Sequence, residues 1–136
     1  MTDVALRQAV RHRADNCCEY CRLPEAFSFI QPFQIEHVVA RKHHGPTTLA
    51  NLALACARCN LHKGTDLTAI DPLTRRVVSL FHPRRMKWSR HFRWDGPVLV
   101  GRTPTGRATI ELLQVDHEDR LALRQDLIEE GLLPTA

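Results

Sequence analysis

Nine consecutive residues, Cys56–Gly64 (CARCNLHKG), combine side chain types that bind metals with side chain types that bind phosphate. Cys56 and Cys59 are separated by two residues, and the same spacing occurs earlier at Cys18 and Cys21. Each pair can direct two thiolates at one ion, and two pairs complete the tetrahedral ligand set of structural zinc. The sequence therefore predicts one structural Zn2+ bound by these four cysteines.

Two other interpretations of the cysteines are a thioredoxin-type redox pair and unligated core thiols, but a single redox motif leaves the second pair unexplained. Cys17 directly precedes Cys18, and two neighbouring residues cannot easily share the geometry of one zinc knuckle. We therefore expect Cys17 to be a buried, inert thiol outside the site. A zinc ion with four thiolate ligands is closed and does no chemistry, so chemistry is expected between the two pairs.

An acid, a histidine and two amides lie between the cysteine pairs or just beyond them: Glu36, His37, Asn51 and Asn60. Hydrolysis of a phosphodiester needs an activated water and a Lewis acid on the phosphate. His37 can accept a proton from water at neutral pH. Oxygen atoms of Glu36 and Asn60 suit Mg2+ or Mn2+. The alternatives are a hydrogen-bonded core histidine at position 37 and a simple turn cap at Asn51.

Several basic side chains are candidates for contacts with nucleic acid, and the alternative for each is a solvated surface position. The stretch from Leu73 to Trp94 holds seven basic residues and no acid, whereas Glu111 to Glu130 holds seven acids and two arginines. This polarity suits a protein with one side facing a polyanion. The basic candidates are Arg41, His43, His62, Lys63, Arg84 and Arg85, and His43 and His62 are also alternative metal ligands. Phe81, Trp88, Phe92 and Trp94 are expected to serve core packing more than base stacking.

The elements that position the central residues follow from the pattern around them. The sequence predicts a strand at Gln34–Val39, a loop, a second strand at Asn51–Ala55, and a short helix near the second cysteine pair that ends at Gly64. Outside this core we expect a helix from Thr2 to about Asn16, strands at Val77–Phe81, Val98–Val100 and Thr109–Leu113, and a helix from about Glu118 to Glu130 closed by Gly131 and Pro134.

The composition is that of an ordinary globular chain: 136 residues, 15.6 kDa, 43% hydrophobic and 25% charged, with a formal net charge of +4. Such a length predicts one domain spanning residues 1–136, with a zinc and catalytic core at 17–64 and a basic extension with a C-terminal helix at 65–136. No apolar run approaches the roughly 20 residues of a membrane span. The N-terminus has no signal-peptide pattern, so we expect a cytoplasmic location, where cysteines bind metals more often than they form disulfides.

The spacing of Glu36-His37, Asn51 and Cys56-x-x-Cys59-Asn60-x-x-Lys63 resembles the HNH endonuclease motif in its zinc-stabilised form. The segments CEYCRLP, IEHVVARKHHG, NLALACARCNLHKG, LFHPR, HFRW and TPTGRATIELL look like a bacterial subgroup of that family. The resemblance implies an α+β fold with a ββα-metal core, an N-terminal helix and a C-terminal extension of strands and a helix. It departs from the family at Asn60, where many members have a third histidine, and at Glu36, where aspartate is more usual.

The resemblance implies a metal-dependent endonuclease that hydrolyses DNA, most often double-stranded. In this interpretation His37 is the general base, Asn51 orients the histidine and ties the loop, and Glu36 and Asn60 hold the catalytic divalent metal. A homodimer or a partner protein would supply specificity, and no membrane is involved. A zinc-stabilised nucleic-acid-binding module without catalytic activity is the alternative, and a redox or zinc-handling protein is more distant.

Overall fold

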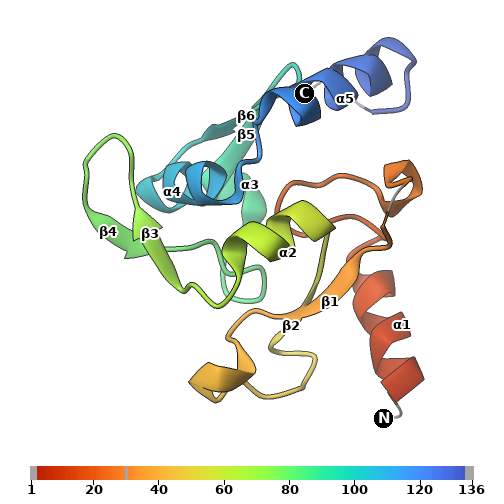
Figure 1. The fold of residues 1–136 in the computed structure, drawn as a ribbon, viewed down its shortest axis with the longest axis vertical. Coiled ribbons are helices and arrows are strands. Elements are labelled where there is room, and N and C mark those ends of the chain that lie inside the picture. The colour runs from red at the N-terminus through yellow and green to blue at the C-terminus, as the bar shows by residue number, and fades with distance from the viewer. Residues whose placement is uncertain (1–2, 30, 134–136) are drawn as a thin grey trace. The chain divides into compact units, whose positions relative to one another are not determined.

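The structure is a computed structural model that describes residues 3–29 and 31–133 (Figure 1). The chain forms two compact units. The N-terminal unit comprises Met1–Leu67 with His82–Met86, and the C-terminal unit comprises Thr68–Phe81 with Lys87–Ala136. The assignment of one domain to residues 1–136 stays a prediction. Within the described residues, no helix is both long and apolar enough to cross a membrane.

The N-terminal unit is built on an antiparallel hairpin followed by a short helix. Its elements are α1 (Asp3–Arg13), η1 (Glu25–Phe27), β1 (Gln34–His37), η2 (Arg41–His43), β2 (Leu52–Ala55) and α2 (Ala57–Lys63). Strand β1 pairs with β2 in a register that sets Glu36 opposite Ala53 and His37 opposite Leu52. Helix α2 packs against β1, and α1 packs against β2. The predicted ββα core of an α+β fold is confirmed.

Helix α1 follows the predicted pattern closely. Val10 and Ala14 are buried, and Leu6 on the same stripe is half-buried. The helix ends at Arg13 because Asp15 and Asn16 adopt left-handed conformations, each with a φ of 54°. Aspartate and asparagine tolerate that region better than other side chains. The predicted N-cap, Thr2, lies outside the described residues.

Helix α2 is defined at both ends by residues of the CARCNLHKG stretch. Cys56 is the N-cap, and its sulfur accepts the N–H of Cys59 at 3.4 Å. Gly64 has a φ of 51°, a left-handed conformation that favours glycine, and its N–H donates to the carbonyl of Asn60. The helix therefore ends at Lys63, as the position of Gly64 predicted.

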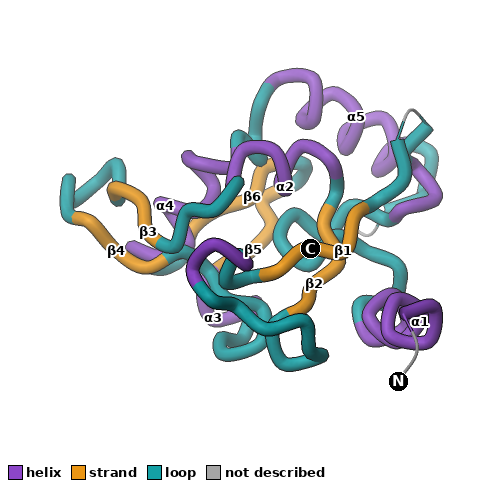
Figure 2. The backbone as a smooth tube through the Cα atoms, turned by 60° about the horizontal axis from the view of Figure 1, so that its bottom comes forward, coloured by secondary structure: helices purple, strands orange, loops and turns teal. Residues whose placement is uncertain are grey.

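The C-terminal unit consists of two hairpins and three helices. Its elements are β3 (Thr68–Ile70), β4 (Val77–Ser79), α3 (Trp88–His91), β5 (Phe92–Asp95), β6 (Val98–Gly101), α4 (Pro104–Leu113) and α5 (Glu118–Glu129). The hairpins β3–β4 and β5–β6, orange in Figure 2, both pack against α4. Four aromatic side chains form a cluster of edge-on and tilted ring contacts, namely Phe81, Trp88, Phe92 and Trp94. Their expected packing role is confirmed.

The predicted strand at Thr109–Leu113 is wrong, because these residues form the second half of α4. Thr103 caps the helix by accepting the N–H of Gly106, and Pro104 follows at its first turn. The β-branched Thr109 is accommodated because its hydroxyl donates to the Thr105 carbonyl at 2.7 Å. The predicted strands near Val77 and Val98 and the helix from Glu118 are confirmed, whereas β3 and β5 were not predicted. Pro134 lies outside the described residues.

Candidate functional site

The two cysteine pairs meet in the interior of the N-terminal unit. The sulfur atoms of Cys18, Cys21, Cys56 and Cys59 all lie within 4.8 Å of one another, and all four residues are buried. The Cys21 and Cys56 sulfurs are 3.8 Å apart. Zinc–sulfur bonds of about 2.3 Å in a tetrahedron place neighbouring sulfurs about 3.8 Å apart, so the donor set fits a four-thiolate zinc site.

Hydrogen bonding within this cluster converges on the sulfur of Cys56. The pKa of Cys56 lies well below its ordinary value, because the thiols of Cys18, Cys21 and Cys59 and the Cys59 N–H all donate towards its sulfur. Burial raises the pKa of Cys18 and of the half-buried Cys17. Cys17 lies outside the cluster, as predicted, but it is half-buried and not buried as expected.

Glu19 joins the segment of Cys18 and Cys21 to the β1–β2 hairpin through hydrogen bonds. Its N–H donates to the Leu54 carbonyl at 2.9 Å, and its carboxylate accepts the Leu54 N–H at 2.9 Å. The guanidinium of Arg84 forms an ion pair with the same carboxylate. The sequence predicts that Arg84 contacts nucleic acid. In the structure its guanidinium pairs with Glu19 within the N-terminal unit. Arg85 is exposed.

Glu36 faces the interior beneath α2. Its side chain accepts a hydrogen bond from the Tyr20 hydroxyl, and its second oxygen lies 3.8 Å from the Lys63 Nζ. Burial raises the pKa of Glu36 to about 7, although Lys63 and the Tyr20 hydrogen bond oppose this shift. Lys63 is 2% exposed and donates to the Val38 carbonyl at 2.8 Å. The prediction that Lys63 contacts phosphate is therefore corrected, because its ammonium is enclosed.

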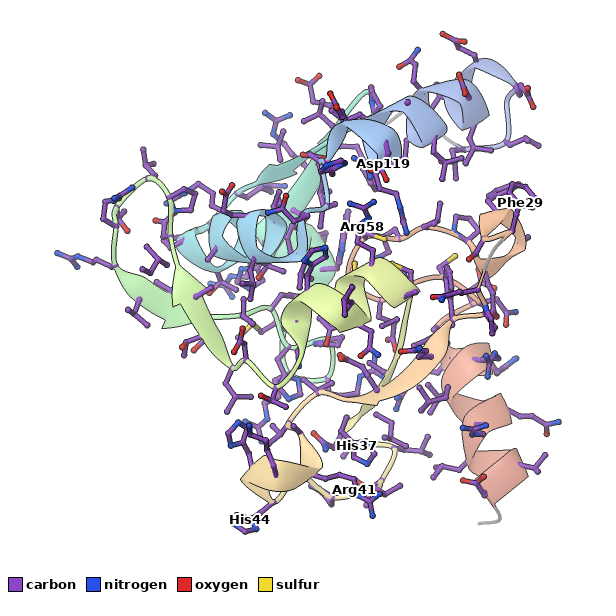
Figure 3. All side chains as sticks on the ribbon, in the orientation of Figure 1. Phe29, His37, Arg41, His44, Arg58 and Asp119 are labelled. Atoms are coloured by element: carbon purple, nitrogen blue, oxygen red, sulfur yellow. The ribbon has the colours of Figure 1, made fainter. Side chains whose placement is uncertain are left out.

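His37 lies on the opposite face of β1 from Glu36, because successive strand residues point to opposite faces. Its Nε2 is 2.8 Å from the Thr47 hydroxyl. Both residues line a recess of about 310 Å³ together with Arg7 and Arg41. Figure 3 shows His37 and Arg41 close together beside η2. Burial and the Arg41 charge lower the pKa of His37, so the imidazole is neutral at pH 7 and can accept a proton.

The Asn51 side chain stabilises the loop that follows His37 through hydrogen bonds to its backbone. Its side chain carbonyl accepts the Val39 N–H at 3.0 Å, and its amide donates to the carbonyls of Val39 and Pro46. A Cβ at Gly45 would lie 1.7 Å from the Val39 carbonyl oxygen, so only glycine fits this close approach. The loop role expected for Asn51 agrees with these contacts.

Asn60 lies apart from the recess around His37. Its amide donates to the Gln34 side chain carbonyl, and both residues line a second recess of about 440 Å³ with His62 and Arg58. His62 and His43 are exposed. The predicted ligands of a hydrolytic metal thus have different surroundings, with Glu36 enclosed and Asn60 at the surface.

Three residues that contact the predicted site were not predicted from the sequence. Glu19 and Tyr20 stand between Cys18 and Cys21, and that position is the one signal that could have indicated them. Thr47, which contacts His37, belongs to a loop without a distinguishing pattern. Their roles depend on contacts between segments that are distant in sequence.

Comparison with known proteins adds an independent line of evidence. Residues 18–66 match the family model described as HNH endonuclease. Septu protein PtuB of Bacillus thuringiensis is 27% identical over 134 residues, a match that covers 96% of this chain and 48% of that protein. The chain therefore spans about half the length of this relative. No solved structure gives a significant match. The matched segment holds both cysteine pairs, the β1–β2 hairpin and α2, and residues 18–66 are a domain of the HNH endonuclease family.

Proposed function

We propose that this chain is a metal-dependent endonuclease that hydrolyses phosphodiester bonds in DNA, with His37 as the general base. The observation that carries the proposal is the surroundings of His37. A neutral imidazole held by Thr47 lines a recess to which Arg7 and Arg41 also contribute. A phosphate in this recess would meet a base and the guanidinium groups of Arg7 and Arg41, beside Asp3, which pairs with Arg7 at 3.9 Å. Guanidinium groups suit the charge and shape of a phosphate.

The Thr47 contact suggests which histidine nitrogen accepts the proton. If the Nε2–H of His37 donates to the Thr47 hydroxyl, Nδ1 is the unprotonated nitrogen. Nδ1 then takes a proton from the attacking water while the arginines stabilise the charge on the phosphate. Thr47 is in this scheme a positioning residue that holds the imidazole ring in place.

A divalent ion, Mg2+ or Mn2+, would supply Lewis acidity at the phosphate. Glu36 and Asn60 are the proposed ligands, but as arranged they do not form a ligand set. The carboxylate of Glu36 faces Tyr20 and Lys63, and Asn60 faces Gln34. Binding of the ion would require Glu36 to exchange these partners.

The four cysteines fit a second, structural ion. Cys18, Cys21, Cys56 and Cys59 would hold one Zn2+ in a closed site, where it stabilises the fold and takes no part in hydrolysis. For sequence specificity we propose a second copy of the chain or a partner protein.

The enclosed position of Glu36 favours one alternative, a zinc-stabilised nucleic-acid-binding module without catalysis. Nicking of supercoiled plasmid distinguishes the two functions when Mg2+, Mn2+ or Ni2+ is added to protein that retains its zinc. We expect nicking that depends on the added ion and is lost in His37→Ala. DNA binding without nicking under every ion would refute the nuclease and support the binding module.

A further inference from the structure

The turn of the β3–β4 hairpin presents apolar and cationic side chains to solvent. Three large apolar residues are exposed there: Ile70 by 57%, Leu73 by 71% and Val77 by 68%. Arg75 and Arg76, at the same turn, are also exposed. Single exposed apolar residues are common on protein surfaces, but several together beside two arginines indicate a contact surface.

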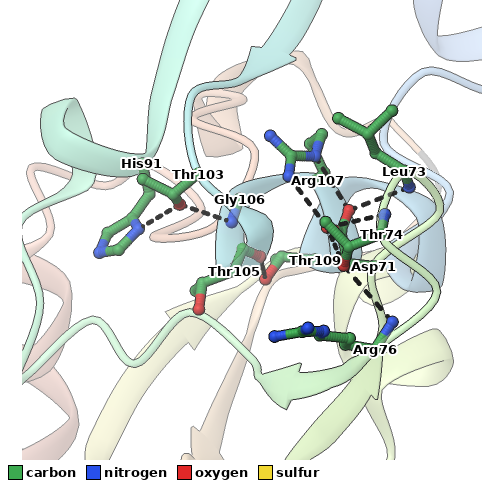
Figure 4. Close-up of polar contacts among 10 residues, drawn as sticks. All are labelled: Asp71, Leu73, Thr74, Arg76, His91, Thr103, Thr105, Gly106, Arg107 and Thr109. Carbon is green, nitrogen blue, oxygen red and sulfur yellow. Dashed lines mark hydrogen bonds and ion pairs between the residues drawn. The ribbon is translucent and has the colours of Figure 1, made fainter.

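This turn is held in place by a buried carboxylate. Asp71 accepts the N–H groups of Leu73 and Thr74 at 3.2 and 3.3 Å and the Thr74 hydroxyl at 2.7 Å (Figure 4). Arg107 of α4 donates to both Asp71 oxygens at 2.9 Å. The contact surface is therefore fixed to α4, and little conformational entropy remains to be lost when a ligand binds.

Charge at the turn comes from the two exposed arginines alone. Asp71 is the one acid of the hairpin, and Arg107 neutralises it. Arg75 has a φ of 66°, a left-handed conformation that glycine or asparagine adopts more readily than arginine. Local folding therefore does not favour arginine at this position, which points to a role for its side chain at the surface.

We propose that the β3–β4 hairpin is a second DNA contact, separate from the recess around His37. Arg75 and Arg76 bind backbone phosphates, and Leu73 with Val77 packs against the sugar faces of the minor groove. Proteins that contact this groove also combine arginines with apolar side chains, although their apolar groups frequently insert between base steps. The proposal rests on the proposed function in taking DNA as the ligand.

The test measures binding of a labelled DNA duplex by fluorescence anisotropy over a range of salt concentrations, in the His37→Ala background so that no DNA is cut. Arg75→Asn with Arg76→Gln should reduce the salt slope of log K by about 2, because each phosphate contact contributes about 0.9. Asparagine is chosen because it tolerates the left-handed turn. Leu73→Ser should weaken binding about tenfold without changing the slope.

The matched control is Arg90→Gln with Arg93→Gln, which removes two exposed charges from the same unit. This control should leave the slope close to that of the parent protein. An equal reduction in both double variants would mean diffuse attraction and overturn the proposal, as would unchanged binding in the hairpin variants. Release of a dimer to monomers by Leu73→Ser, with DNA affinity unchanged, would identify a second copy of the chain as the occupant and also overturn it.

Failure of this proposal is distinguishable from failure of the proposed function. Suppose that the wild type nicks plasmid when the ion is added, and that the hairpin variants bind DNA as well as the parent protein does. This result would refute the hairpin contact and leave the proposed nuclease function standing. Hairpin-dependent binding by a wild type that never nicks DNA would keep the contact and refute the nuclease. Equal melting temperatures and circular dichroism spectra of all variants would establish that the fold is intact in each comparison.

Discussion

Tyr20 donates its phenolic hydrogen to the buried carboxylate of Glu36. Tyr20 stands between Cys18 and Cys21, and Glu36 directly precedes His37 in β1. The bond therefore joins the cysteine cluster to the strand that holds the proposed general base. Burial and the Glu36 charge raise the pKa of Tyr20 well above its ordinary value, so the hydroxyl remains a donor at neutral pH.

Removal of this donor should destabilise the N-terminal unit. We expect Tyr20→Phe to lower the free energy of unfolding by about 1–3 kcal/mol, because the buried Glu36 loses a hydrogen bond. The pKa of Glu36, about 7 in the wild type, should rise in the variant, because the Tyr20 hydroxyl stabilises the charged carboxylate in the wild type. Urea unfolding at constant zinc measures the first effect. Stability equal to the wild type would show that the bond contributes nothing.

The raised pKa of Glu36 predicts a pH dependence of folding. An ordinary glutamate titrates near 4.3, and Glu36 titrates at about 7 in the folded chain. The folded state therefore retains a proton that the unfolded state releases, so the contribution to stability is fully present below pH 4 and is lost as pH rises through 7. Between these values the contribution falls by about 4 kcal/mol.

Glu36→Gln isolates this effect because glutamine does not titrate. The free energy of unfolding of the wild type should fall more steeply between pH 5 and 8 than that of the variant, with zinc retained and no other divalent ion added. Parallel curves would mean that Glu36 titrates normally and is accessible to water or to an ion.

Local sequence patterns predicted much of the fold, and long-range contacts account for the rest. The paired cysteines and Gly64 indicated α2, and the apolar stripe of Val10 and Ala14 indicated α1. The β-branched Thr109 and Ile110 locally favour a strand, but the cap at Thr103 and Pro104 at the first turn start a helix that continues through them. The enclosure of Lys63 was not predictable, since it depends on Glu36 and Val38, which lie far from it in sequence.

The cysteine cluster predicts one tightly bound zinc per chain. Cys18→Ser should leave the protein largely unfolded, because structural zinc contributes about 10–16 kcal/mol to small domains. Cys17→Ser is the matched control, and its zinc content and melting temperature should match the wild type. Elemental analysis of folded protein measures the metal. Folded, zinc-free wild type would refute the four-cysteine site.

Substitutions of the neighbouring residues Arg84 and Arg85 should differ in their effect on the stability of the protein. Arg84 pairs with the buried Glu19, so Arg84→Ala leaves a carboxylate without its cation and should cost about 3–5 kcal/mol. Arg85 is exposed, and Arg85→Ala should change the free energy of unfolding by less than about 0.5 kcal/mol. Chemical denaturation compares the two. Equal losses would mean that the Glu19 pair contributes nothing specific.

The recess around His37 predicts a separation of catalysis from folding. His37→Ala should lower DNA cleavage by about 10²–10⁴-fold, the usual effect of losing a general base. Its zinc content and melting temperature should stay close to wild type, because His37 lies outside the cysteine cluster. Cleavage by the variant at the wild-type rate would remove His37 from the mechanism, and His43 or His62 would become the candidates for the base.

Three further variants test how the surroundings of His37 set its function. Thr47→Val should lower the cleavage rate because the imidazole ring of His37 loses the hydrogen bond that orients it, and Thr47→Ser should restore the rate by keeping the hydroxyl. Since Arg41 helps to lower the pKa of His37, Arg41→Gln should raise that pKa. Cleavage needs the neutral imidazole, so the loss of rate on acidification should begin at a higher pH in Arg41→Gln than in the wild type. A pH–rate profile of both proteins measures this shift, and coincident acidic limbs would mean that Arg41 does not act on the base.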